Sequence, residues 1–213
     1  EDTIIYRTIA QNVQNAVLAI PVGFSSDEVA AAWGCVKEAK QPRLQIELPV
    51  STIQMEYMYH IKQAKMIEKI AELTKAAKAV CEDVEFSALD ATRADEDCLI
   101  AAVKEAQANG ATMVTICDDA GNSTPDEIAA LVEKVKEAVQ VPVYVCVSDR
   151  INMAVASAFA AIGKGADGLK CAMAGKDVLL AGELSDAMSA CSAQIDAEIK
   201  LDRTKIHASI DDM

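Results

Sequence analysis

The stretch of sequence that decides the fold is VEFSALDATR, residues 84–93. It begins with a short apolar run, Val84 to Ser87, whose length and composition are those of a buried β-strand. The charged residues Asp90 and Arg93 follow where this strand would end. The stretch therefore predicts a strand that brings polar side chains to one edge of a sheet.

Similar apolar runs recur on both sides of this stretch. They cover residues 16–20, 44–50, 112–117, 143–147 and 168–173, which makes six predicted strands in all. The segments between them have helical periodicity, and one apolar face is formed by Ile128, Leu131, Val132, Val135 and Val139. Strand and helix therefore alternate along the whole chain.

Helix boundaries carry recognisable signals. Ser25 with Glu28, and Thr124 with Glu127, each combine an N-cap residue with an acid in the first turn. Residues that stop helices or precede strands are Pro42, Gly110, Pro142 and Gly165. Short connections of this kind are typical of repeated βα units.

Strict alternation of strand and helix predicts a parallel sheet covered by helices. Two architectures fit this pattern, a doubly wound sheet and part of a (β/α)8 barrel. A doubly wound sheet often has a G-x-G-x-x-G turn after its first strand, and the sequence has none. Periodicity alone leaves both open, because it does not report whether a sheet closes.

Composition narrows the class of protein. Of 213 residues, 52% are apolar and 4% aromatic, which suits one large domain with an aliphatic core. The formal net charge of −13 disfavours nucleic acid and anionic membranes as partners.

Seven cysteines without the spacing of a zinc ribbon or thioredoxin motif indicate reduced thiols. With neither a signal peptide nor a long apolar run, we expect a cytoplasmic protein without a membrane segment.

Residues 84–93 closely resemble the V-E-F-S-A-E-D-A-T-R signature of the 2-isopropylmalate and homocitrate synthases, which are HMG-CoA-lyase-like TIM-barrel enzymes. The resemblance continues in the same order through residues 110–112, 116–121 and 124–125. Upstream, residues 49–57 read PVSTIQMEY and are similar to the family's A-T-S-D-I-H-M-E-Y. The resemblance covers roughly residues 1–185.

The resemblance implies a (β/α)8 barrel that joins an acyl-CoA to a 2-oxo acid with the help of a divalent metal. In that frame the six strands are the third to eighth of the barrel, so we expect a partial or modified barrel of about six parallel βα units. Residues 1–213 then form a single domain that lacks the first two units, and residues 184–213 form a C-terminal helical segment.

The family's metal ligands do not recur in this sequence. Its H-x-H pair is replaced by Cys146 and Ser148, and its asparagine loop corresponds to residues 175–182, which have no asparagine. A neutral hydroxyl is a poor ligand for hard divalent ions. No cofactor is therefore expected, and Mg, Mn or Zn enters only if the missing strands come from a partner.

Candidate catalytic residues are Glu85, Arg93 and Lys170. The carboxylate and guanidinium lie where they could act on a substrate at a strand end, although a structural ion pair would place them there as well. A desolvated Lys170 could form a Schiff base with a carbonyl. The alternatives are a lysine paired with Glu85 or Asp118, or one that reaches solvent.

Candidate substrate-binding residues are Ser51, Gln54, Asp118 and Asp119. Gln54 replaces the family's histidine in H-M-E-Y, and Asp119 replaces the threonine that would contact the oxo acid. Cys117, Cys146 and Cys171 lie near the ends of three consecutive strands and are read as core filling or as a soft-metal or redox site. Because Cys117 precedes an inward Asp118, pleat alternation predicts that it points away from the mouth.

The preferred function is a degenerate 2-isopropylmalate/homocitrate synthase-like protein that acts as a binding or assembly subunit without the metal-dependent condensation. Six strands leave two open edges, so we expect a homo-oligomer, or a hetero-oligomer with a synthase-like chain. A 2-oxo acid or an acyl-CoA is a possible ligand. The alternatives are an acyltransferase completed by a partner chain, a metal-free carbonyl-lyase or aldolase that uses Lys170, and a fragment of a longer protein.

Overall fold

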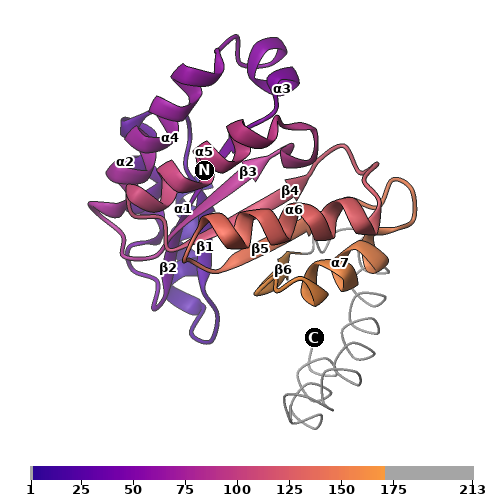
Figure 1. The fold of residues 1–213 in the computed structure, drawn as a ribbon. Helices are drawn as coiled ribbons and strands as arrows, with labels where there is room; N and C mark the ends of the chain where they lie inside the picture. Colours follow the sequence, from indigo (N-terminus) through magenta and orange to yellow (C-terminus); the bar gives the residue numbers. More distant parts are fainter. Residues whose placement is uncertain (1, 171–213) are drawn as a thin grey trace, which may run out of the picture.

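Six parallel strands form one curled sheet in the computed structural model, which describes residues 2–170 (Figure 1). The strands follow one another in sequence order from β1 to β6. Their bounds are β1 Leu18–Pro21, β2 Pro42–Pro49, β3 Val84–Leu89, β4 Met113–Asp118, β5 Val143–Val147 and β6 Gly168–Lys170. Every neighbouring pair is parallel. The predicted partial barrel of about six parallel βα units is thereby confirmed.

Helices connect the strands and form one layer around the sheet. Their bounds are α1 Asp2–Asn12, α2 Ser26–Val36, α3 Thr52–Tyr57, α4 Gln63–Lys78, α5 Glu96–Ala108, α6 Pro125–Ala138 and α7 Ala154–Gly163, with a 3₁₀ turn η1 at Ala91–Arg93. The long helices α4, α5, α6 and α7 each pack against the next, which places them side by side on the outside of the curl (Figure 1).

The predicted helix boundaries hold because the capping side chains reach backbone donors. The Ser25 hydroxyl accepts from the Glu28 amide, and Thr124 and Glu127 form a complete capping box. At helix ends, Gly110 has a φ of +108° and Gly165 a φ of +91°. These are left-handed conformations that a side chain would strain.

The core lies between the sheet and the helical layer. Alternate residues of the central strands face outward and are fully or almost fully buried, namely Leu44, Ile46, Leu48, Val84, Phe86, Ala88, Val114 and Ile116. They pack against apolar helix residues such as Ile70, Val103 and Val132. Burial on this side accounts for the apolar residues at every second position of these strands.

The opposite side of the sheet is lined by a different set of residues, here called the inner face. Pleat alternation and strand register place there the side chains of Arg43, Gln45, Glu47, Glu85, Ser87, Met113, Thr115, Cys117, Tyr144, Cys146 and Lys170. In a closed barrel this side is a packed core of mainly branched apolar residues. Here it is largely polar.

Within residues 2–170, β1 and β6 each pair with a strand on one side only. The helix next to β1 in sequence, α1, exposes apolar side chains, with Ile4 71% and Ile5 56% exposed.

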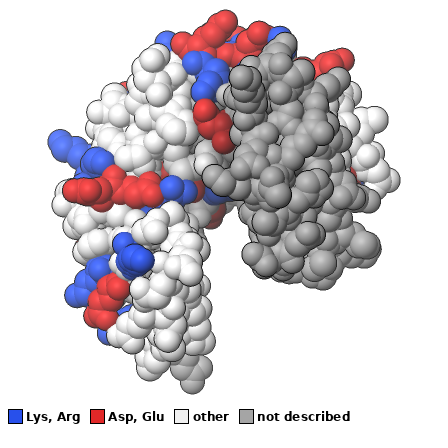
Figure 2. All heavy atoms as spheres, turned by 90° about the horizontal axis from the view of Figure 1, so that it is seen from below, with Lys and Arg blue, Asp and Glu red and all other residues white. Residues whose placement is uncertain are grey.

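Basic and acidic side chains are intermixed on the face of the molecule shown in Figure 2. No helix in the described part of the chain is long and apolar enough to cross a bilayer.

Residues 171–213 lie outside the described residues. The end of the sixth predicted strand at 171–173, the loop at 175–182, Cys171 and the C-terminal helical segment at 184–213 all fall there. The single-domain assignment of residues 1–213 therefore stays a prediction.

The capping box of α6 provides a test of the fold. Replacing Thr124 with Ala removes the hydroxyl that accepts from the Glu127 amide, and we expect the free energy of unfolding to fall by about 1 kcal/mol. Urea unfolding followed by circular dichroism measures this loss. Ser123→Ala, one residue earlier, is the matched control and should change stability by less than half as much. An equal loss in both variants would contradict the assigned helix start.

Candidate functional site

The centre of the candidate site is the carboxylate of Glu85 on β3, which is 1% exposed. One of its oxygens, Oε1, accepts hydrogen bonds from Thr115 Oγ1 at 2.7 Å and from Ser87 Oγ at 2.9 Å. The same oxygen pairs with the ammonium of Lys170, which reaches back across the inner face from β6. Glu85 thus connects side chains from β3, β4 and β6.

The second oxygen of Glu85, Oε2, has no hydrogen-bond partner among the described residues. Nη1 of Arg43 lies 4.0 Å from this oxygen, and Nη2 of Arg43 pairs with Asp83 at 2.8 Å. A buried carboxylate requires a compensating charge, and Lys170 supplies most of it. Of the alternatives weighed for Lys170, the structure supports pairing with Glu85.

Glu47 extends this polar cluster toward the mouth. The amide of Gln45 donates to Glu47 Oε1 at 2.8 Å and to Ser87 Oγ at 3.1 Å. Partial desolvation raises the pKa of Glu47, and the negative charges of Glu85 and Asp119 add to this effect while Lys170 opposes it. The inner face therefore holds two acids, Glu47 and Glu85, and two cations, Arg43 and Lys170.

At the end of β3, Asp90 takes a left-handed conformation with a φ of +56° and is completely buried. Its carboxylate accepts hydrogen bonds from the Ser51 hydroxyl and, at 2.7 Å, from Nε of Arg93. The Ser51 hydroxyl also accepts a hydrogen bond from the backbone N–H of Gln54 and so caps helix α3. Arg93 therefore pairs with Asp90, three residues before it, and not with Glu85.

The two predicted substrate-binding acids have different surroundings. Asp118 Oδ1 accepts from Thr92 Oγ1 at 2.7 Å and from the Gly121 amide at 3.1 Å, while its buried Oδ2 has no partner in the described residues. Asp119 Oδ2 accepts from Gln54 Nε2 at 3.1 Å. The two positions that depart from the family motif, 54 and 119, are thus bonded to each other.

Cys117 lies on the inner face, so the expectation that it points away from the mouth is wrong. Cys117 is the register partner of Cys146, and Cys146 is the register partner of Lys170. Asp118 is the last residue of β4, and its side chain bonds the turn that follows and not the inner face. The contact between the thiols raises the pKa of Cys117 and lowers that of Cys146.

The side chains at the family's metal positions do not fit a hard divalent ion. A thiol stands at Cys146 and a hydroxyl at Ser148, and the nearest inner-face neighbour of Cys146 on β6 is the cation Lys170. Within residues 2–170 no group of three His, Cys, Asp or Glu side chains is arranged to hold a metal. Hard divalent ions prefer several oxygen ligands without a cation beside them.

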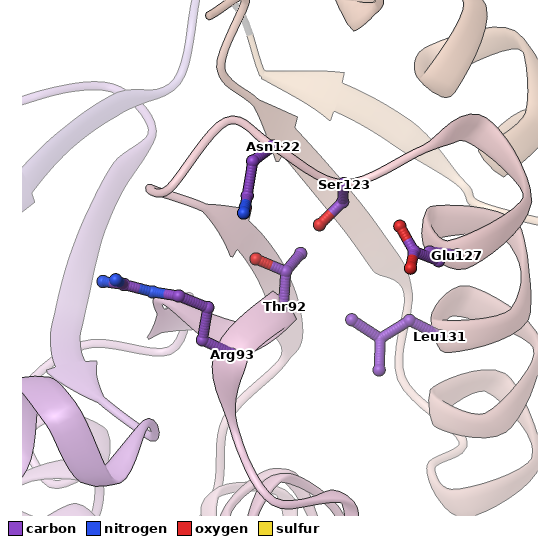
Figure 3. Close-up of a pocket in the computed structure, with 6 residues that line it drawn as sticks. All are labelled: Thr92, Arg93, Asn122, Ser123, Glu127 and Leu131. Atoms are coloured by element: carbon purple, nitrogen blue, oxygen red, sulfur yellow. The ribbon is translucent and has the colours of Figure 1, made fainter. Parts of the chain in front are cut away.

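A polar pocket of about 230 Å³ lies beyond the ends of β3 and β4 (Figure 3). It is lined by Thr92, Arg93, Asn122, Ser123, Glu127 and Leu131. Figure 3 shows Thr92 pointing from the 3₁₀ turn toward Asn122 and Ser123 of the next loop, whereas the Arg93 side chain extends to the side. Of the predicted site residues, Arg93 alone lines this pocket.

Sequence reasoning missed Arg43, Ser87 and Thr115 as partners of Glu85. Pleat alternation puts each of them on the same side of the sheet as Glu85, so part of the signal was present. Only the strand register shows that Thr115 and Lys170 reach the same carboxylate oxygen. Asn122 and Ser123 were missed because a loop has no periodicity from which to assign a direction.

Removing Lys170 tests the buried ion pair. In Lys170→Met the Glu85 carboxylate keeps its burial but loses its cation, so we expect the free energy of unfolding to fall by about 3 kcal/mol. Lys164→Met is the matched control, because Lys164 pairs with Glu133 on the surface, where both side chains are about half exposed. It should cost less than about 1 kcal/mol. Equal losses in chemical unfolding would contradict the central role of the pair.

Glu47 provides a test by pH. Because desolvation raises its pKa in the folded state, folding favours the protonated form, and this contribution is lost as pH rises through the folded pKa. Glu47→Gln should therefore raise the melting temperature near neutral pH, and the gain should disappear below the ordinary pKa of a glutamate, about 4.3. Glu137→Gln, an exposed glutamate of α6, is the control. A gain that does not depend on pH would contradict this assignment.

Comparison with known proteins agrees with the fold and with the motifs. Residues 1–177 match the model of the HMGL-like family. A 2-isopropylmalate synthase from Clostridium kluyveri is 32% identical over 175 residues, which cover 79% of this chain and 34% of that protein. A 2-isopropylmalate synthase from Carboxydothermus hydrogenoformans is 33% identical over 171 residues, 78% of this chain and 34% of that protein. The chain thus spans about a third of the length of these relatives.

Solved structures share the fold at low sequence identity. The hydroxymethylglutaryl-CoA lyase from Pseudomonas aeruginosa superposes with a TM-score of 0.69 at 15% identity, covering 99% of this chain and 79% of that one. The HMG-CoA lyase from Brucella melitensis gives a TM-score of 0.62, covering 78% and 60%. The resemblance carried by residues 84–93 is confirmed, and the chain belongs to the HMGL-like family, with 2-isopropylmalate synthases among its relatives.

Proposed function

We propose that this chain is a degenerate 2-isopropylmalate synthase-like protein that acts as a binding or assembly subunit and does not carry out the metal-dependent condensation of an acyl-CoA with a 2-oxo acid. The observation that carries the proposal is the ion pair between Glu85 and Lys170. The carboxylate that the sequence offers as a catalytic candidate is engaged by a lysine, a threonine and a serine of the same chain.

The other candidate residues are engaged in a similar way. Gln54 donates to Asp119, and Ser51 and Arg93 both donate to Asp90. A general base must be able to reach the proton that it removes, and these carboxylates already accept hydrogen bonds from the protein. Their contacts support a role in holding the connections after β2, β3 and β4 together.

Assembly is supported by the open sheet and by the apolar surface of α1. An unpaired strand edge exposes backbone donors and acceptors that another chain can pair with. Within the described residues β1 has such an edge, and α1 exposes Ile4 and Ile5 close to it in sequence. A second copy of the chain, or a synthase-like chain that contributes strands, would cover these groups.

The alternative is an acyltransferase completed by a partner chain. The polar pocket of Figure 3 favours it, because Arg93 uses its Nε for Asp90 and lies with Thr92, Asn122 and Ser123 around a volume that suits a small carboxylate such as a 2-oxo acid. Metal ligands would then come from strands of the partner chain. A Schiff base on Lys170 is less favoured, since it requires Lys170 to leave Glu85.

Native mass spectrometry and a CoA-release assay separate these functions. The chain should form a dimer or larger assembly at micromolar concentration, and it should release no thiol from acetyl-CoA with a branched 2-oxo acid and Mg²⁺, Mn²⁺ or Zn²⁺. Ile5→Asp should shift the assembly toward monomer, because it places a charge on the exposed apolar surface. Thr3→Asp, on the same helix, is the control and should leave the assembly unchanged.

Two results would contradict the proposal. One is a monomer at every concentration, which would argue against assembly. The other is thiol release that depends on both the metal and the 2-oxo acid, which would favour the acyltransferase.

A further inference from the structure

Two cysteines face each other across neighbouring strands of the inner face. Cys117 on β4 is the direct register partner of Cys146 on β5, and both thiols are free. Neighbouring parallel strands lie about 4.8 Å apart, which is within the range of about 4.4–6.8 Å between the Cα atoms of disulfide-bonded cysteines. The backbone therefore already holds the two residues at a separation that a disulfide can span.

The two thiols differ in their access to solvent. Cys117 is 6% exposed, whereas Cys146 is partly exposed and lies one residue before the end of β5. A small oxidant in solution would reach the Cys146 thiol first. The buried Cys117 thiol would then react with the oxidised Cys146. The position of Cys146 near the strand end also lets its backbone adjust more easily than at the centre of a strand.

The other free cysteines of the described residues have different surroundings. The Cys81 thiol donates to the carbonyl of Asp83 at 3.1 Å, and the Cys98 thiol donates to the carbonyl of Val50 at 3.4 Å. Both belong to the apolar core, as does the buried Cys35. Buried thiols of this kind fill space and are inert. They are internal controls for the pair on the inner face.

We propose that Cys117 and Cys146 form a reversible redox pair that a peroxide converts to a disulfide between β4 and β5. The sulfur of Cys146 attacks one peroxide oxygen and the O–O bond breaks, which gives a sulfenic acid on Cys146 and, from hydrogen peroxide, one water. The sulfur of Cys117 then attacks the sulfur of Cys146, the S–O bond breaks and a second water leaves. The two thiols lose two electrons and two protons in total, and the peroxide is reduced to two waters.

The disulfide would be readily reduced again. In parallel strands the paired side chains point the same way, so the Cβ atoms must move closer together than the regular sheet places them. Strained disulfides have higher reduction potentials and are the labile ones. A small thiol such as glutathione should therefore restore both cysteines.

The experiment uses the full chain under native conditions. The protein is treated with stoichiometric hydrogen peroxide, blocked with N-ethylmaleimide and digested without reduction, and its peptides are identified by mass spectrometry. We expect a disulfide-linked peptide pair that contains Cys117 and Cys146, which disappears after glutathione treatment. Before oxidation, Cys146 should react with maleimide about tenfold faster than Cys98.

Single substitutions assign the order of the steps. Cys117→Ser should leave a sulfenic acid on Cys146 that dimedone traps, and Cys146→Ser should leave Cys117 reduced. Cys98→Ser is the matched control and should still form the disulfide. The peptide map of the unsubstituted chain needs no variant, so the test stands even if one variant fails to fold.

Three outcomes would overturn the proposal. Cys146 could be found bonded to Cys171 or to a second copy of the chain, and either result would show that Cys117 is not its partner. Oxidation of Cys35, Cys81 and Cys98 at the same rate as Cys146 would show that the position of Cys146 opposite Cys117 does not make its thiol more reactive than the others. Disulfide formation only in urea would show that the folded sheet prevents the bond.

Discussion

A carboxylate in the middle of a β-sheet must be neutralised by its neighbours, and the inner face of this protein is organised around that requirement at Glu85. Leaving such a charge unpaired costs several kcal/mol, which is a large fraction of the stability of a whole domain. Lys170, Thr115 and Ser87 all contact one oxygen of Glu85. The ion pair joins the third strand of the sheet to the sixth and so spans half the curl.

A polar inner face can coexist with an ordinary apolar core because the core lies on the opposite side of the sheet. The outward side chains of the same strands pack against the helices, and this apolar layer supplies most of the driving force for folding. The inner face then needs only to satisfy its polar groups. Gln45 and Ser87 bond each other there, Glu85 Oε2 is left without a partner in the described residues, and beyond the end of β3 Asp90 pairs with Arg93.

The departures from the family motif are coupled in space. Gln54 and Asp119 are 65 residues apart in sequence, yet the amide of one donates to the carboxylate of the other. Cys146, which stands in place of a histidine of the family motif, lies between Cys117 and Lys170 on adjacent strands. The altered positions thus form two neighbouring sets, Gln54 with Asp119 and Cys146 beside Cys117 and Lys170.

The sequence by itself determined the order and type of the elements, because apolar periodicity, capping residues such as Thr124 and glycines such as Gly110 act within a few neighbouring residues. The motif at 84–93 added the barrel family. Only the tertiary structure decided which polar groups meet, since pairing depends on register between strands that are distant in sequence. Lys170 reaches Glu85 and Arg93 pairs with Asp90 for this reason. Cys117 faces inward because it lies on the same side of β4 as Thr115, whose hydroxyl bonds Glu85, whereas the Asp118 side chain bonds the following turn.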